Sequence, residues 1–216
     1  MNTDKSEALK SARLYVIVGS ALCRGAVEDA VSAALRGGAD VIQLREKGVY
    51  EADYVTLARR VKKIVADAGK TFIVNDNPSV ALSSGADGVH VGADDVPLLE
   101  CRLLLGPDAI VGVSTHSVED VVAASEGGAD YVGFGPVFET ETKAQARPAL
   151  GLEPLRAAAA AAAAAAAKVP LFAIGGMTVE RVAGVLATGA HGIAVASAIA
   201  SAEDVESAAR RFREQL

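Results

Sequence analysis

The chain has 216 residues, of which 51% are hydrophobic, and its formal net charge at pH 7 is −6. This length can bury one large core and suits one α/β domain better than two small ones. The acidic balance argues against a nucleic-acid partner, which would need a basic surface. Cys23 and Cys101 lack metal-type spacing, which favours reduced thiols and a cytoplasmic location. We identify neither a signal peptide nor a membrane span, and expect no membrane partner.

Short runs of β-favouring apolar residues alternate with segments of helical spacing along the chain. The expected strands cover residues 14–18, 40–45, 72–74, 89–91, 109–113, 131–134, 171–174 and 193–196. The expected helices cover residues 27–35, 54–68, 78–85, 96–105, 118–126, 152–167, 179–187 and 202–212. Eight such pairs in this length predict an α/β fold, a single (β/α)8 TIM barrel over residues 1–216, with residues 1–12 as a polar extension or helix.

Two further patterns favour structural roles. A weak repeat precedes every second strand, as Gly38-Ala39-Asp40, Gly85-Ala86-Asp87, Gly128-Ala129-Asp130 and Gly189-Ala190-His191. These residues fall at the N-terminal ends of strands, the barrel face concerned with stability, so we expect no catalytic role for them. Eleven consecutive alanines, Ala157 to Ala167, predict an outer helix without a specific function.

Carboxylates follow two consecutive strands in the middle of the chain. Asn75-Asp76 ends one strand, and Asp94-Asp95 follows the next. Neighbouring parallel strands lie about 4.8 Å apart, so Asp76 and one of Asp94 and Asp95 can face one small space. Oxygen ligands of this kind suit Mg²⁺. The alternative is that these residues cap helices or solvate loops.

Cationic side chains follow the second strand. Gln43, Arg45 and Lys47 share the two-residue period of a strand and therefore point the same way. Two cations converging on a barrel mouth suit a phosphate or pyrophosphate. The alternative is a surface ladder of salt bridges with Glu46 or Glu51.

Further polar groups follow the later strands. Ser114 and His116 follow the fifth strand, and a long loop, residues 135–151, follows the sixth. A loop of this length is more often a lid than a plain connection. Gly176 and Ser197 follow the last two strands, where barrels of this type commonly hold a phosphate.

Taken together, QLREK, VNDN, GVHVGADD, GVSTH, GPVFETETK, AIGGM and AVASAI, in this order, resemble thiamine-phosphate synthase over about Leu14 to Ile199. The resemblance implies a Mg²⁺-dependent transferase. It would couple 4-amino-2-methyl-5-(diphosphooxymethyl)pyrimidine with 4-methyl-5-(2-phosphooxyethyl)thiazole or its 2-carboxylate, giving thiamine phosphate and pyrophosphate.

The resemblance also implies roles for single residues. Asp76 and Asp95 would bind Mg²⁺. Thr140, Thr142, Gly176 and Ser197 would hold the thiazole phosphate. The pyrimidine diphosphate would be held by Gln43, Arg45, Lys47, Asn75, Ser114 and Lys143, and of these Arg45, Lys47, Ser114 and Lys143 would be catalytic.

Three positions depart from the pattern of this family. Glu139 stands where the family has proline, Val18-Gly19-Ser20 replaces a threonine-aspartate ending, and Ala93 replaces a glutamine. None of them removes a predicted metal or diphosphate ligand. We expect them to affect how the substrates are positioned and therefore the reaction rate.

The chemistry is consistent with this set of residues. A thiazole nitrogen attacks through a lone pair and has no proton to lose, so no general base is required. We therefore expect a dissociative substitution driven by stabilisation of the departing pyrophosphate. Two other functions stay open, a thiazole tautomerase using His116 and a non-catalytic phosphate-binding barrel. His90 and His191 are interpreted as structural, and the sequence does not decide whether the protein forms a homo-oligomer.

Overall fold

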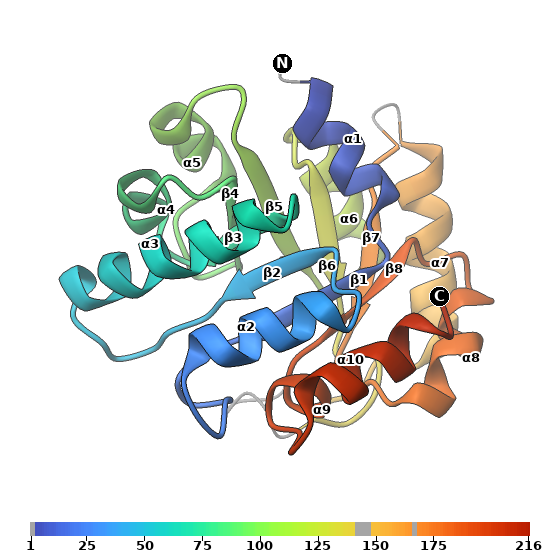
Figure 1. The fold of residues 1–216 in the computed structure, drawn as a ribbon. Coiled ribbons are helices and arrows are strands. Elements are labelled where there is room, and N and C mark those ends of the chain that lie inside the picture. Colours follow the sequence, from blue (N-terminus) through green and yellow to red (C-terminus); the bar gives the residue numbers. More distant parts are fainter. Residues whose placement is uncertain (1–2, 141–147, 166–167) are drawn as a thin grey trace.

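The computed structural model describes residues 3–140, 148–165 and 168–216. Its eight parallel strands are hydrogen-bonded in chain order, and pairing of the first with the last closes the barrel (Figure 1). The strands are β1 (Leu14–Val18), β2 (Val41–Leu44), β3 (Thr71–Asn75), β4 (Gly88–Val91), β5 (Ile110–Thr115), β6 (Tyr131–Phe134), β7 (Leu171–Ile174) and β8 (Gly192–Val195). The predicted (β/α)8 fold is confirmed.

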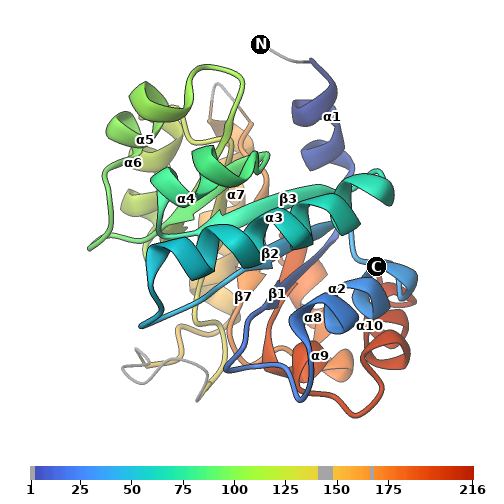
Figure 2. The same cartoon turned by 60° about the vertical axis from the view of Figure 1, so that its left-hand side comes forward.

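Helices follow the strands and pack side by side round the outside, for example from α10 through α2 and α3 to α4 (Figure 2). The helices are α1 (Thr3–Ser11), α2 (Val27–Arg36), α3 (Glu51–Asp67), α4 (Pro78–Ser84), α5 (Leu98–Leu105), α6 (Val118–Glu126), α7 (Leu152–Ala164), α8 (Val182–Leu186), α9 (Ser197–Ala200) and α10 (Val205–Arg213). The helix expected over residues 179–187 is instead a 3₁₀ turn, η1 (Val179–Arg181), followed by α8. Among the described helices, none has both the length and the apolar character that a membrane crossing requires.

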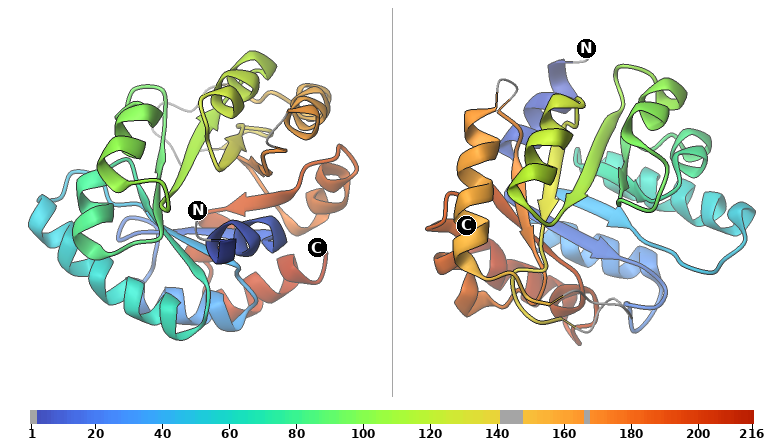
Figure 3. Two further views of the ribbon diagram at one scale, coloured as in Figure 1. Left: turned by 90° about the horizontal axis from the view of Figure 1, so that it is seen from above. Right: turned by 180° about the vertical axis from the view of Figure 1, so that it is seen from behind.

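Strand alternation divides the apolar side chains into two cores. Residues such as Val16 and Val89 point outward and pack against the helices. Residues such as Tyr15 and Phe172 point inward and fill the barrel. Helix α1 lies across the N-terminal end of the barrel, where its Leu9 is buried in the inner core (Figure 3, left). The barrel is thus closed at that end, and a ligand must enter from the other.

The aspartates of the sequence repeat bind the barrel together at its N-terminal end. Each accepts a hydrogen bond from a backbone amide near the start of the strand before its own. These bonds run from Leu14 N to Asp40 Oδ2 (3.1 Å), from Phe72 N to Asp87 Oδ2 (2.9 Å) and from Val111 N to Asp130 Oδ2 (2.7 Å). The repeat therefore has the structural role expected from its position.

Asp40→Asn is expected to lower the free energy of unfolding at pH 7 by about 1–3 kcal/mol, because Asp40 also pairs with Lys70 (2.9 Å) and Arg213 (2.7 Å). Burial alone would raise the pKa of Asp40, but hydrogen bonds from the Arg13 amide and Lys70 lower it below the ordinary 3.8. Because the pKa of Asp40 is lower in the folded state, its charge adds stability at pH values above the pKa of the unfolded state. This stability is lost as the pH falls through the folded-state pKa.

Urea unfolding at pH 7 and near pH 3 measures this effect, and the difference between Asp40→Asn and wild type should shrink at the lower pH. Asp67→Asn is the matched control. Its pair with Lys63 is solvent-exposed (3.2 Å), so its loss should change stability by less than about 0.5 kcal/mol. A constant difference at both pH values would contradict the assigned role of the Asp40 charge.

Candidate active site

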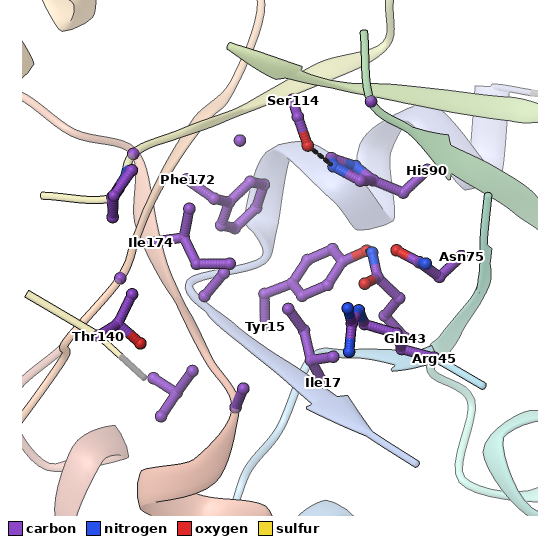
Figure 4. A pocket seen from close by; sticks show the side chains of 18 of the residues that line it. Tyr15, Ile17, Gln43, Arg45, Asn75, His90, Ser114, Thr140, Phe172 and Ile174 are labelled. Atoms are coloured by element: carbon purple, nitrogen blue, oxygen red, sulfur yellow. Dashed lines mark hydrogen bonds between the residues drawn. The ribbon is translucent and has the colours of Figure 1, made fainter. Parts of the chain in front are cut away.

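A cavity of about 540 Å³ lies at the C-terminal ends of the strands, and inward-pointing residues of all eight strands line it (Figure 4). It contains every predicted site residue that the described ranges include. These are Gln43, Arg45, Lys47, Asn75, Asp76, Asp95, Ser114, Thr140, Gly176 and Ser197. Thr142 and Lys143 lie outside the described residues.

One side of the cavity is cationic. Gln43 ends the inward series of β2, and Arg45 and Lys47 continue it past the end of the strand, so all three line the cavity as their spacing predicts. The Arg45 amide donates to the carbonyl of Val18 (2.8 Å), which ties this segment to β1. The ammonium group of Lys47 forms an ion pair with Asp76.

Glu46 lies between these cations in sequence and points the other way. It is buried and accepts hydrogen bonds from the Ser20 amide (2.7 Å) and the Ser20 hydroxyl (2.9 Å). Its carboxylate is therefore used in joining the loops that follow β1 and β2. Instead of the alternative surface ladder of salt bridges with Glu46 or Glu51, Lys47 pairs with Asp76, while Glu46 binds Ser20 and Glu51 accepts from the Asn77 side-chain amide (3.3 Å).

The two carboxylates meet as predicted. β3 and β4 are neighbours, and the Asp76 amide extends their pairing by donating to the carbonyl of His90 (2.8 Å). Asp76 has a φ of 64°, which turns its side chain out of the strand and toward the cavity. The pKa of Asp95 is raised because burial disfavours its charge and because Asp76 lies within hydrogen-bonding reach.

Neither carboxylate caps a helix. The N-cap of α4 is Asn77, whose side chain accepts from the Val80 amide (3.0 Å). Helix α5 begins after Pro97 and has no side-chain cap, while Asp95 accepts from the Gly92 amide (2.8 Å). The capping alternative for Asp76 and Asp95 is therefore excluded.

The opposite side of the cavity is built from the ends of β6, β7 and β8. Gly176 has a φ of 61°, and a Cβ atom there would lie 2.4 Å from the carbonyl oxygen of Glu139. Only glycine fits where these two loops touch. Arg181 holds the contact, since it donates to the Gly176 carbonyl while its guanidinium lies 4.4 Å from the ring centre of Phe138. Thr140 and Ser197 line this side.

Residues 14–199 match a family model described as thiamine monophosphate synthase. The chain belongs to this family. It is 45% identical to the thiamine-phosphate synthase of Moorella thermoacetica, over 93% of this chain and 94% of that one. It is 43% identical to the thiamine-phosphate synthase of Shouchella clausii, over 94% of this chain and 95% of that one. A solved structure of thiamine phosphate pyrophosphorylase from Pyrococcus furiosus has a TM-score of 0.85 and 34% identity, covering 97% of this chain and 96% of its own.

Membership of the thiamine monophosphate synthase family makes this chain an enzyme, a transferase of thiamine biosynthesis. Of its departures from the family pattern, Glu139 lies exposed at the point where the loop after β6 touches the Gly176 loop. Ser20 is a partner of Glu46, so the altered ending of β1 still joins the segment that carries Arg45. Ala93 lies exposed at the edge of the cavity.

Several residues of this cavity were not predicted from the sequence. Ser114 lies within β5, which is longer than expected, and its hydroxyl contacts Nε2 of His90 (2.9 Å). His90 was assigned a structural role, but its side chain lines the cavity. Val89 and Val91 on either side belong to the outer core, so strand alternation was the available signal. The aromatic residues Tyr15 and Tyr131 also point inward and line the cavity, and the same alternation could have identified them.

Proposed function

We propose that this chain joins 4-amino-2-methyl-5-(diphosphooxymethyl)pyrimidine to a thiazole phosphate, giving thiamine phosphate and releasing pyrophosphate. The observation that carries the proposal is a cavity with two unlike ends. One end has Arg45 and Lys47 beside a pair of carboxylates, and the other has Gly176 and Ser197. A diphosphate and a monophosphate are the ligands that suit these two ends. The relatives are thiamine-phosphate synthases, which supports the same product.

At the first end we assign Arg45 and Lys47 to the diphosphate. Arg45 offers a planar fork of donors and Lys47 a compact charge, so together they suit an anion with many oxygens. Gln43, Asn75 and Ser114 line the adjoining inner wall and would hold the pyrimidine portion and its nearest phosphate oxygens. Lys143, which lies outside the described residues, would complete the cationic shell.

The same end fits a magnesium ion. Burial and the neighbouring Asp76 carboxylate raise the pKa of Asp95, and a bound divalent cation would offset both effects by stabilising the charged form. Asp76 and Asp95 offer hard oxygen ligands and leave other positions to water and phosphate oxygens, as Mg²⁺ prefers. When bound, the ion would supply positive charge to the departing pyrophosphate.

At the second end we assign the backbone amide of Gly176, with Ser197 and Thr140, to the thiazole phosphate. Thr142, outside the described residues, would join them. The Arg181 guanidinium binds the Gly176 carbonyl and so helps to hold the loop that also carries the Gly176 amide. A fixed amide binds an anion without further ordering, which lowers the entropic cost of binding.

This reaction requires little proton transfer by the protein. The thiazole nitrogen attacks the methylene carbon through its lone pair, the bond from that carbon to the diphosphate oxygen breaks, and the electrons leave with pyrophosphate. Arg45 and Lys47 stabilise the charge that develops on the leaving group. The electron-rich aminopyrimidine supports a substitution in which bond breaking leads, and the two ends of the cavity hold the partners in line.

A coupled assay tests the proposed function. Purified protein is mixed with both substrates and Mg²⁺, and thiamine phosphate and pyrophosphate are measured together. Equal amounts of the two products, dependent on both substrates, are expected. Binding of both substrates without turnover would instead indicate a non-catalytic phosphate-binding barrel.

His116→Asn is expected to lower the coupling rate by less than about tenfold. The Nδ1 atom of His116 contacts the carbonyl of Gly135, and coupling needs no base at Nε2. If the protein were instead a thiazole tautomerase that used His116 as a general base, loss of that base would lower its rate by about 10²- to 10⁴-fold. Rates of this variant and of Asp76→Asn are measured with the coupling substrates, and a larger defect at His116 would contradict the synthase mechanism.

A further inference from the structure

A line of hydrogen bonds crosses the interior of the barrel along the wall of the cavity and joins five strands. Its members are side chains of β2, β1, β6, β4 and β5. The contacts run from Gln43 Nε2 to Tyr15 OH (2.8 Å), from Tyr15 OH to Tyr131 OH (2.8 Å), from Tyr131 OH to His90 Nδ1 (3.0 Å) and from His90 Nε2 to Ser114 Oγ (2.9 Å). Figure 4 shows its last contact, with His90 and Ser114 facing the cavity. The proposed reaction uses the two ends of this line and leaves its three central members without a role.

The residues packed around this line of hydrogen bonds leave room for its side chains and hold them in place. Tyr15, Tyr131 and Gln43 are each at most 2% exposed. A Cβ atom at Gly112 of β5 would lie 2.1 Å from Cζ of Tyr131, so only glycine at that position leaves room for the ring. The rings of Tyr15 and Tyr131 lie 5.7 Å apart between centres and both pack against Phe172. The hydroxyl groups are therefore held in place by packing as well as by each other.

The direction of the hydrogen bonds follows from counting protons. The Gln43 amide donates to Tyr15, and we assign the single Tyr15 proton to Tyr131 and the Tyr131 proton to Nδ1 of His90, so that each hydroxyl donates once. Burial raises the pKa of both tyrosines above the ordinary value, so both hydroxyls keep their protons at neutral pH. A neutral imidazole that accepts at Nδ1 carries its proton on Nε2, where it donates to Ser114.

We propose that Tyr15, Tyr131 and His90 are positioning residues that set the hydrogen-bond direction at the pyrimidine diphosphate end of the cavity. They fix His90 as the Nε2–H tautomer. The oxygen of Ser114 is then already an acceptor, and its own proton is directed to the ligand. At the other end the Gln43 amide is engaged through nitrogen, which leaves its carbonyl oxygen as an acceptor.

This arrangement matches the ligand chemistry, and it rests on the proposed function for the identity of that ligand. Diphosphate oxygens only accept hydrogen bonds, so a serine beside them must donate. An exocyclic amino group donates, so it requires an acceptor such as the Gln43 carbonyl. The barrel interior therefore presents one donor and one acceptor in fixed positions before the substrate arrives, which is a form of preorganisation.

The first test uses the protein without any substrate and does not depend on the proposed function. Nitrogen-15 NMR of the imidazole rings at pH 8 reports which ring nitrogen carries the proton, and His90→Gln identifies the His90 signals among the three histidines. We expect the Nε2–H form in the wild type, and a mixture of tautomers in Tyr131→Phe, which lacks the donor to Nδ1. An Nδ1–H form in the wild type would overturn the proposal.

The second test is kinetic. Tyr15→Phe and Tyr131→Phe keep the rings and remove only the hydroxyls. Each is expected to raise the KM for the pyrimidine diphosphate about 3- to 10-fold and to change the KM for the thiazole phosphate by less than about twofold. Thr188→Val is the matched control, because it removes a buried hydroxyl that donates to Val185 (2.6 Å) outside this line.

A merely structural role predicts different results. If the two tyrosine variants lose stability but change both KM values equally, or change neither, the positioning role is wrong. If the chain does not couple the two substrates at all, the proposed function fails, while the NMR result still decides the tautomer.

Discussion

Asp76→Asn and Asp95→Asn are each expected to lower the turnover number of coupling by about 10²- to 10³-fold, with the fold intact. The two carboxylates follow neighbouring strands and face the same cavity, and neither α4 nor α5 depends on them as a cap. Removing one charge would therefore weaken Mg²⁺ binding and the stabilisation of the departing pyrophosphate. Initial rates over a range of Mg²⁺ concentrations check the result.

The same variants have a readout that needs no turnover. Mg²⁺ should raise the unfolding temperature of the wild type by binding the folded state, and this rise should be lost in both variants. Without metal, Asp95→Asn should be at least as stable as the wild type at pH 7. The raised pKa of Asp95 means that its charge opposes folding above its ordinary pKa, so neutralising it removes the cost of burying the charge and the repulsion from Asp76.

Asp94→Asn is the matched control for the metal site. Asp94 also lies at the cavity, but it is exposed and is not assigned as a ligand. Its loss should change the rate by less than about threefold. If Asp94→Asn is as defective as Asp95→Asn, or if both proposed ligand variants keep full activity at limiting Mg²⁺, the metal assignment is wrong.

Arg45→Gln is expected to lower kcat/KM for the pyrimidine diphosphate by about 10- to 10²-fold, because charge-assisted hydrogen bonds to phosphate oxygens would be lost. The effect on thiazole phosphate binding should be much smaller, since Gly176 and Ser197 follow β7 and β8 on the opposite side of the cavity. Arg45→Lys should recover part of the loss, as it restores the charge but not the planar fork of donors. Direct binding of each ligand, measured separately by calorimetry, checks the division.

Arg59→Gln provides the control for a general effect of charge. Arg59 lies on the outer surface in α3 and donates to the Ser83 carbonyl (3.0 Å), away from the cavity. Arg59→Gln removes the same charge as Arg45→Gln and should leave the affinities for both ligands within about twofold of the wild-type values. Equal losses of both ligands in Arg45→Gln would count against two separate phosphate sites.

The sequence by itself determined the order of the elements and much of the site. Strand alternation is a local property, so the common direction of Gln43, Arg45 and Lys47 could be read before the fold was known. The adjacency of Asp76 and Asp95 followed from two consecutive strands in a parallel barrel. Helix α4 was bounded by Pro78 and Gly85, residues whose backbone preferences act locally.

Tertiary structure decided what meets across the interior. Tyr15 and Tyr131 are far apart in sequence, and their contact depends on the closure of β1 on β8 and on the register of every strand between. The register between β4 and β5 brings His90, which was interpreted as structural, against Ser114 at the cavity. Local periodicity gives the side of a strand on which a residue lies. Which residues face each other inside a closed barrel depends on strand stagger, which no single segment of the sequence encodes.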